Sequence, residues 1–314
     1  MSKKRKMVLW EVAALVALLA GILAGFSQAQ PVKEGGRLKV ATTTSLYDTG
    51  LWDYLEPIFE ERYKVQLDVI YGGSGIALEH GKRGDVDVLA IHDRTREDRF
   101  IKEGYGVNRR CFAYNYFILV GPENDPAKIK GLSPEDAFKK LLYEGRKNPA
   151  RVKFVSRGDD SGTHSREKNI WSQAGYSYET IRKSGPWYIE AGRGMGPTLL
   201  MANEMQGYTL TDTGTFLALK GRLSLVPLVE KGKALLNVYA VLAVNPEKHP
   251  WVNIEMANKL INFLISEEIQ KLIGEYGIKT YGMPLFVPCG KGACKKIGCP
   301  TWEKCAKPAT WPPQ

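Results

Sequence analysis

The amino-acid sequence predicts an α/β protein made of two lobes with a ligand cleft between them. Strand-like and helix-like segments alternate from residue 37 onward, and the alternation restarts after residue 122, which is typical of a largely parallel sheet covered by helices. Two apolar segments, 111–121 and 236–245, are long enough to run from one lobe into the other. Two such crossing strands form a hinge. The strand ends of both lobes then face one cleft, where α/β proteins bind ligands.

The first lobe is predicted to be discontinuous, built from 37–115 plus 245–287. Leu38 and Val40 alternate with basic residues, which is typical of a strand, and the hydroxyl run at 42–45 is expected to follow as an exposed loop. The other elements of this lobe are helices expected over 50–63, 76–84, 96–106 and 251–277, and strands expected over 65–71 and 86–92.

The second lobe is predicted over 120–238. Ser133 is expected to cap a helix over 133–145, with Pro134 at its first position, because serine accepts a hydrogen bond from the first turn and proline lacks the donor that would be unpaired there. The other elements are helices expected over 161–175, 196–206 and 213–221, and strands expected over 151–156 and 208–212.

Residues 1–29 have the features of an export signal. Four basic residues stand at 3–6, an apolar run interrupted only by Glu11 follows, and small residues end the segment at Ala29. The run is also long enough to remain as a membrane anchor. In either case the body is predicted to be extracytoplasmic, in the periplasm or at the cell surface.

The last segment, 288–314, is predicted to be a cysteine-rich tail. Its four cysteines are separated by four, four and five residues, and they are Cys289, Cys294, Cys299 and Cys305. These spacings fit neither the common zinc pairs nor the tight ferredoxin runs well. Two disulfides in an oxidising compartment are the preferred interpretation, with three pairings open, and a metal site or free thiols are the alternatives. Cys111 stands alone in the sequence, and its role is open.

Charge favours a small anion over a nucleic acid as the ligand. The formal net charge is +10, and a basic protein attracts nucleic acid, anionic membranes or small anions. The body has no dense basic run and no aromatic–basic recognition motif. No nucleic-acid partner is therefore expected.

The stretch FVSRGDDSGTHSREKNIW, residues 154–171, is the leading candidate for a site. It lies between a predicted strand and a predicted helix, so the backbone N–H groups of Ser161, Gly162 and Thr163 are expected to point out of the helix start, where small anions bind. Arg157 adds a full charge with forked donors. The alternative is a plain capped helix that begins at Asp160 or Ser161. No Glu or Gln stands three residues after either one, so no capping box uses these donors.

A serine nucleophile and a cell-adhesion tripeptide are the other interpretations of this stretch. A nucleophile elbow needs G-x-S-x-G, which neither Ser74 nor Ser161 has. The histidines are scattered without metal-type spacing, and the tripeptide at 157–159 is short enough to arise by chance. We therefore expect no catalytic residue, no metal and no cofactor, and the protein is predicted not to be an enzyme.

Two further hydroxyl turns follow predicted strands in the first lobe. One is TTTS at 42–45, and the other is YGGSG at 71–75, which carries Ser74 before a helix. Neither is a nucleotide-binding P-loop, because G-x-x-x-x-G-K-[ST] is absent. A single ion in contact with these turns and with the 154–171 stretch would stabilise the closed state of the two lobes.

In these residues the sequence resembles the extracytoplasmic tungstate-binding proteins of ABC importers, which are relatives of phosphate- and molybdate-binding proteins. The resemblance covers about 37–287 and rests on three segments in order, ATTTSLYDTGLWDYLEPIFEE, GSGIALEHGKRGDVDVLAIHD and FVSRGDDSGTHSREKNIW. It implies a type II periplasmic-binding-protein fold that delivers an oxyanion to a membrane permease. The tail after residue 288 departs from the family pattern.

The resemblance also implies a set of ligand residues. They are Thr43, Thr44, Ser45, Ser74, Arg157, Ser161, Gly162 and Thr163. An aspartate two positions after the arginine, here Asp159, recurs in the related phosphate-binding proteins, and we expect it to orient Arg157 without touching the ion.

The expected ligand is tungstate or molybdate. Both are dianions with four acceptor oxygens, whereas phosphate near neutral pH keeps a proton that needs an acceptor. The expected partners are the oxyanion and the permease of an ABC importer, together with the membrane if the leader stays uncleaved, and a monomer is expected. The alternatives are a phosphate-binding protein and a membrane-tethered oxyanion sensor.

Overall fold

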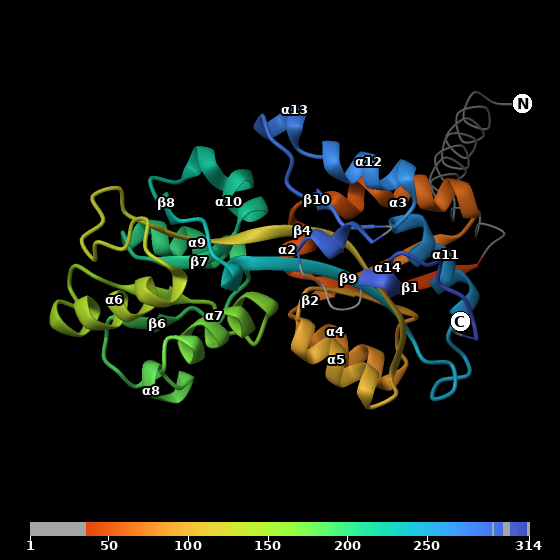
Figure 1. Cartoon of the computed structure of the whole chain (residues 1–314), viewed down its shortest axis with the longest axis horizontal. Coiled ribbons are helices and arrows are strands. Elements are labelled where there is room, and N and C mark those ends of the chain that lie inside the picture. The colour runs from red at the N-terminus through yellow and green to blue at the C-terminus, as the bar shows by residue number, and fades with distance from the viewer. Residues whose placement is uncertain (1–35, 291, 298–301, 313–314) are drawn as a thin grey trace, which may run out of the picture. The chain divides into compact units, whose positions relative to one another are not determined.

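Two long antiparallel strands, β4 (Gly106–Gly121) and β9 (Leu236–Val244), run side by side and belong to both halves of the body (Figure 1). The computed structural model describes residues 36–290, 292–297 and 302–312. Asn115 of β4 pairs with Asn237 of β9, so both strands carry a polar residue at the same level of an otherwise apolar pair. This pair confirms the two crossing strands expected from the sequence, although β4 begins five residues earlier than predicted.

The first half of the body is built on a sheet in the order β2-β1-β3-β9-β4-β10. Strand β1 is parallel to β2 and β3, whereas β9 enters antiparallel between β3 and β4. Its other strands are β1 (Arg37–Thr43), β2 (Gln66–Gly72), β3 (Val88–Ile91) and β10 (Val287–Pro288). Its helices are α2 (Thr44–Asp48), α3 (Leu51–Tyr63), α4 (Ser74–Arg83), α5 (Arg94–Lys102), α11 (Ile254–Leu264), α12 (Glu267–Glu275) and α13 (Ile278–Tyr281).

The second half is built on the C-terminal end of β4 and on four shorter strands. β7 and β8 both pair antiparallel with β4, and parallel strands β5 and β6 join them through a bridge between Phe154 and Tyr208. The strands are β5 (Phe154–Ser156), β6 (Tyr188–Glu190), β7 (Thr209–Asp212) and β8 (Val226–Val229). The helical elements are α6 (Pro134–Lys147), α7 (Gly162–Gln173), α8 (Tyr178–Arg182), α9 (Met195–Glu204), α10 (Thr213–Leu219), η1 (Lys220–Arg222) and η2 (Lys233–Leu235).

Separate apolar clusters support the two halves. One cluster gathers only residues between 117 and 235, with Trp171 and Trp187 fully buried. Another gathers residues of 41–101 together with 242–252. The largest cluster combines α3, α11 and α12 with β1 and parts of α9 and α10. The lobe limits given above stay a prediction, since these clusters do not fix where one lobe ends.

The local patterns predicted most of the elements and missed some boundaries. Ser133 caps α6 by accepting the Asp136 N–H, with Pro134 at the first position, as expected. The helix expected over 251–277 is in fact two helices, because Ser266 adopts an extended conformation that starts α12. The hydroxyl run at 42–45, expected as an exposed loop, ends β1 and begins the short helix α2, and all of it is buried except the half-buried Thr44. The sequence did not predict β6, β8 or α8.

The tail continues with η3 (Ala293–Ile297) and α14 (Trp302–Cys305). Cys289, Cys294 and Cys305 are buried here, and no disulfide joins two of the described cysteines. The two disulfides expected among the four tail cysteines would need one bond between two of these three residues, and none is present, so that expectation is wrong. Cys299 and the leader at 1–29 lie outside the described residues, and the export signal stays a prediction. Among the described helices, none combines the length and the apolar character that crossing a bilayer requires.

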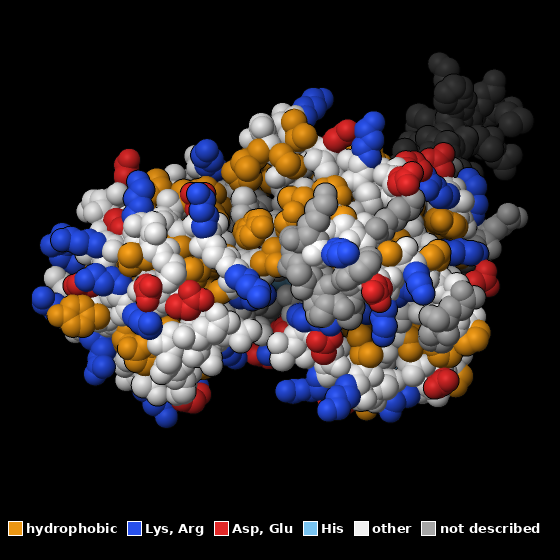
Figure 2. Space-filling model, viewed as in Figure 1, with side chains coloured by type: hydrophobic (Ala, Val, Ile, Leu, Met, Phe, Trp, Pro, Cys, Tyr) orange, Lys and Arg blue, Asp and Glu red, His pale blue; other side chains and the backbone are white. Residues whose placement is uncertain are grey.

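Charged side chains are scattered over the described surface. On the face shown in Figure 2, lysines and arginines alternate with aspartates and glutamates over both halves, and no single basic patch dominates this face. The surface hollows between the two halves at the lower edge of this view (Figure 2).

Gly145 of α6 provides a test of how tightly the second half is packed. A Cβ at this position would lie 2.5 Å from the ring of Trp187, which is fully buried and has no room to move. We expect Gly145→Ala to lower the free energy of unfolding by about 1–3 kcal/mol, as other overpacked cores do. The matched control is Gly221→Ala, where no atom lies within 4 Å of the added methyl group. Equal unfolding free energies for the two variants in urea titrations would contradict this packing.

Candidate anion-binding site

The turn between β5 and α7 is shaped by residues with left-handed backbone conformations. Gly158 and Asp160 have φ values of 62° and 58°, so the chain doubles back before the helix begins at Gly162. Ser161 is the N-cap, and its Oγ accepts the His164 N–H at 3.2 Å. The capped helix and the anion cradle are therefore compatible interpretations of the same turn, since one donor is capped and the rest of the helix start remains.

Arg157 is the charged centre of this turn. The residue is only 2% exposed, and its Nη2 donates to Asp159 Oδ2 and, at 3.4 Å, to Thr44 Oγ1 of the first half. Asp159 Oδ1 in turn accepts the Ser161 N–H at 3.2 Å. Asp159 thus holds Arg157 in place, as expected. One expectation is wrong, because the backbone N–H of Ser161 points to Asp159 and not outward from the helix start.

Three of the predicted ligand residues carry buried polar atoms with no hydrogen-bond partner among the described residues. These atoms are Ser74 Oγ, Arg157 Nε and Thr163 Oγ1. A buried donor without a partner costs about 1–3 kcal/mol, and more when the group is charged. Such atoms are rare in native proteins and call for an explanation. Here they belong to three different segments of the chain.

Close backbone approaches bring these segments together. A Cβ at Gly73, next to Ser74, would lie 3.6 Å from Ser161 Cα, and a Cβ at Gly162 would lie 2.8 Å from the His92 ring. Glycine is required at position 162 because any side chain there would collide with a buried imidazole. The GSG turn and the start of α7 therefore face each other as the sequence predicted.

The hydroxyl run at 42–45 joins the same cluster in an altered role. Thr43 is the N-cap of α2, and its Oγ1 accepts the Leu46 N–H at 3.4 Å. Thr44 lies beside Arg157. Ser45 is 1% exposed, and its Oγ is 3.1 Å from His92 Nε2. The structure thus places all three predicted residues near the site, although the hydroxyl groups of Thr43 and Ser45 already have partners.

A buried hydrogen-bond chain links Ser45 to the crossing strands. His92 Nδ1 lies 2.8 Å from Asn237 Oδ1, and the Asn237 amide donates to Asn115 Oδ1 and to the Tyr239 hydroxyl. Because Asn237 uses its amide hydrogens elsewhere, its oxygen accepts from His92 Nδ1–H. His92 Nε2 then accepts the hydroxyl hydrogen of Ser45. What Ser45 can still offer an anion is its backbone N–H.

His92 is the residue that sequence reasoning missed. Burial, together with the charges of Arg157 and Arg166, lowers the pKa of His92 to about 4, while the bond to Asn237 opposes the shift. It is therefore neutral near pH 7. Its position in "AIHD", directly after β3, was the available signal, because β3 neighbours β1 and the two strands end at the same edge of the sheet.

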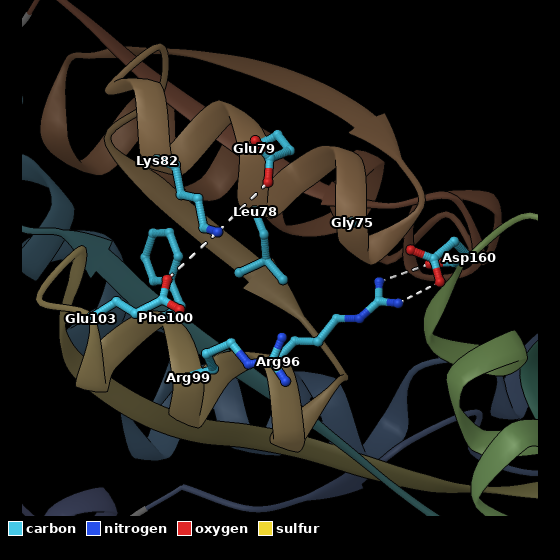
Figure 3. Close-up of a pocket in the computed structure, with 9 residues that line it drawn as sticks. All are labelled: Gly75, Leu78, Glu79, Lys82, Arg96, Arg99, Phe100, Glu103 and Asp160. Carbon is cyan, nitrogen blue, oxygen red and sulfur yellow. Dashed lines mark hydrogen bonds and ion pairs between the residues drawn. The ribbon is translucent and has the colours of Figure 1, made fainter.

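A second arginine joins the first half to the turn that precedes α7. Arg96 of α5 donates from Nη2 to Asp160 Oδ1 at 2.5 Å and from Nη1 to Asp160 O at 2.9 Å, so it reaches from the first half to the start of α7 (Figure 3). The pair borders a surface cavity of about 260 Å³ that also meets Gly75. Asp160 is partly exposed, so this ion pair contributes only modestly to stability, and no motif in the sequence predicted it.

The fold and the convergent donors define a solute-binding protein of the periplasmic-binding-protein class. A family model described as a PBP superfamily domain matches residues 27–268. The chain belongs to this superfamily and, within it, to the family of tungstate-binding proteins called TupA, as the following relatives show.

The TupA protein of Peptoclostridium acidaminophilum is 42% identical over 91% of this chain and 98% of its own length. A solved structure described as the tungstate ABC transporter from Geobacter sulfurreducens is 46% identical, with a TM-score of 0.67, over 76% of this chain and 98% of that chain. TupA from Desulfovibrio alaskensis G20 is 37% identical, with a TM-score of 0.67, over 81% of this chain and 98% of that chain.

The neutral His92 makes a pH-dependent prediction. Between the ordinary histidine pKa of 6.5 and the folded value of about 4, the unfolded chain binds a proton at His92 and the folded chain does not, so stability is lost as the pH falls. We expect His92→Gln to lack this loss, so that between pH 7 and pH 4.5 the wild-type protein should lose about 2–3 kcal/mol of unfolding free energy relative to the variant. Urea unfolding of both proteins at the two pH values measures it, and parallel pH profiles would show that His92 does not titrate in this way.

Proposed function

We propose that this protein is an extracytoplasmic solute-binding protein that captures tungstate, and also molybdate, and delivers the ion to the permease of an ABC importer. Two relatives whose lengths it covers almost completely are named as tungstate-binding proteins or as part of a tungstate transporter. The ion is held by Ser74, Arg157 and Thr163, with Thr44, Ser161, Gly162 and the backbone of Ser45 around it. Thr43 supports the turn from its capping position.

The observation that carries the proposal is the convergence of unpartnered donors. Ser74 Oγ, Arg157 Nε and Thr163 Oγ1 are buried without partners among the described residues, and a tetrahedral dianion offers acceptor oxygens to all three. The start of α7 adds the positive end of a helix dipole. A bound dianion would also accept from Arg157 Nε, the guanidinium donor that the ion pair with Asp159 leaves unused.

The carboxylates near Arg157 favour an ion without protons. Asp159 uses one oxygen for Arg157 and the other for the Ser161 N–H. Asp212 accepts from the backbone N–H and the hydroxyl of Thr215. Each of these carboxylates thus already accepts two hydrogen bonds from the protein, and we infer that neither pairs with a proton on the ligand, which would leave the hydrogen of protonated phosphate unpaired. Tungstate and molybdate meet only donors.

The Ser45–His92–Asn237 chain resembles a catalytic triad in its connectivity but not in its chemistry. A general base works best when its pKa lies near the operating pH, and the pKa of His92 is lowered to about 4. Its third member is a neutral amide that does not stabilise an imidazolium. A structural role in the turn is the better interpretation, which agrees with relatives that are named as binding proteins.

The selectivity of the site tests the proposed ligand. In calorimetry on the purified protein at pH 7.5, we expect tight binding of tungstate and molybdate and no measurable heat from phosphate at the same concentrations, because the phosphate proton finds no acceptor. Sulfate, which is also an unprotonated dianion, separates the effect of charge from that of size. Tight phosphate binding without a tungstate signal would support the alternative of a phosphate importer.

Arg157 tests the location of the site. We expect Arg157→Ala to weaken tungstate binding by about 2–5 kcal/mol, the usual cost of removing a charged partner from a buried contact. The matched control is Arg146→Ala, an exposed arginine at the end of α6, which should bind tungstate with unchanged affinity. An unchanged affinity in Arg157→Ala, with native unfolding behaviour, would remove Arg157 from the site.

A further inference from the structure

Four buried cysteines gather where β4 meets the C-terminal tail. Cys111 lies in β4, Cys294 in η3 and Cys305 at the end of α14, and their three Sγ atoms lie within 4.8 Å of one another. Cys289 packs against them in the same buried cluster. All four residues have no exposed surface and pack as one cluster. Cys111, which stands alone in the sequence, is thus at the centre of the group.

We propose that this cluster is a structural metal site in which the thiolates of Cys111, Cys289, Cys294 and Cys305 bind one divalent ion of the zinc class. Four cysteines around one tetrahedral ion are a common form of structural zinc site. Each thiol releases its proton when the ion binds, because the thiolate is the ligand. The site does not rest on the proposed function, since none of its residues belongs to the anion-binding site.

The spacing of the sulfurs matches a single ion. With zinc–sulfur bonds of about 2.3 Å in a tetrahedron, neighbouring sulfurs lie about 3.8 Å apart, so the three described sulfurs need only small shifts to close on an ion. A cluster of several irons would bind its thiolates through different metal atoms and hold them further apart. Disulfides join sulfurs in pairs, and they give no reason for three sulfurs to lie within 4.8 Å of one another.

Hydrogen-bond donors around the sulfurs suit thiolates. Arg109 Nη1 donates to Cys111 Sγ at 3.3 Å, and the Cys111 backbone N–H donates to Cys305 Sγ at 3.1 Å. Arg109 is itself held by Glu97, whose Oε2 lies 2.6 Å from Arg109 Nε. Four thiolates around a divalent ion leave a net negative charge, and a buried guanidinium that donates to a ligand sulfur offsets part of it.

The tail has few other means of staying folded. The segment 289–305 is rich in glycine and lysine and has few large apolar residues, so it cannot build a core of its own. Polar contacts dock it onto the body, for example from Arg110 to the carbonyl groups of Lys307 and Pro308 at 2.8 and 2.9 Å. A metal ion would join η3 and α14 to β4 at the centre of these contacts.

The spacing rule misled the sequence prediction because it describes ligands that share one local loop. A site that takes one ligand from a strand almost two hundred residues earlier is not bound by the short spacing of C-x2-4-C pairs. The sequence separation of Cys111 from the tail hid the site, and the antiparallel pairing of β10 with β4 brings the two together.

Metal analysis of the purified full chain tests the site. Prepared without chelators, it is expected to contain about one zinc per chain and no iron, and Cys111→Ser and Cys294→Ser are each expected to lose at least about tenfold of that content. Arg157→Ala is the control, since it changes the anion-binding site and should keep the metal. Thermal unfolding of each variant shows whether it is folded.

A second measurement keeps the test independent of how the variants fold. The wild-type chain is stripped with a chelator and reloaded with cobalt(II) alone, which should give the intense thiolate-to-cobalt absorption of a tetrahedral sulfur site. Denatured and unreduced wild-type protein should then yield reactive thiols at all five cysteines. A metal content that survives in Cys111→Ser, or metal-free protein whose tail thiols are blocked by disulfides, would overturn the proposal.

Discussion

The buried guanidinium of Arg157 is the interaction on which the anion-binding site depends. A charge that is only 2% exposed is costly unless it is paired and hydrogen-bonded. Asp159 and Thr44 satisfy part of the guanidinium, and Nε is left over. The left-handed turn at Gly158 and Asp160 and the cap at Ser161 follow Arg157 directly in the chain and lead into α7. In the proposed function, the bound anion accepts from this remaining donor.

A hydrogen-bond chain connects the surroundings of Arg157 to the two crossing strands, β4 and β9. Asn115 and Asn237 lie opposite each other on β4 and β9, and through His92 they reach Ser45 beside the site. An anion that contacts both halves stabilises the closed arrangement only if the turns that bind it are held in fixed positions. Strand β4 also carries Cys111, four residues before Asn115. One strand therefore positions both the hinge network and the sulfur cluster at which the tail docks.

Much of this architecture could be read from local patterns, and the failures share one cause. The strand and helix rhythm, the cap at Ser133 and the three hydroxyl turns depend on neighbours in sequence. The break at Ser266, the burial of 42–45 and the partners of His92 depend on what packs against them from elsewhere in the chain. Arg96 and Asp160 show the same limit, because each is an ordinary charged residue until the fold brings them within 2.5 Å.

The sequence by itself determined the class of fold and predicted the chemistry of the proposed site, because strand ends rich in hydroxyls, a glycine-flanked helix start and a nearby arginine can be recognised without the structure. Only the tertiary structure decided which donors are left for an anion. It showed that the Ser161 N–H belongs to Asp159 and that the Ser45 hydroxyl belongs to His92. The tertiary structure also showed that Cys111 lies beside the tail, which the sequence could not predict because the two are far apart along the chain.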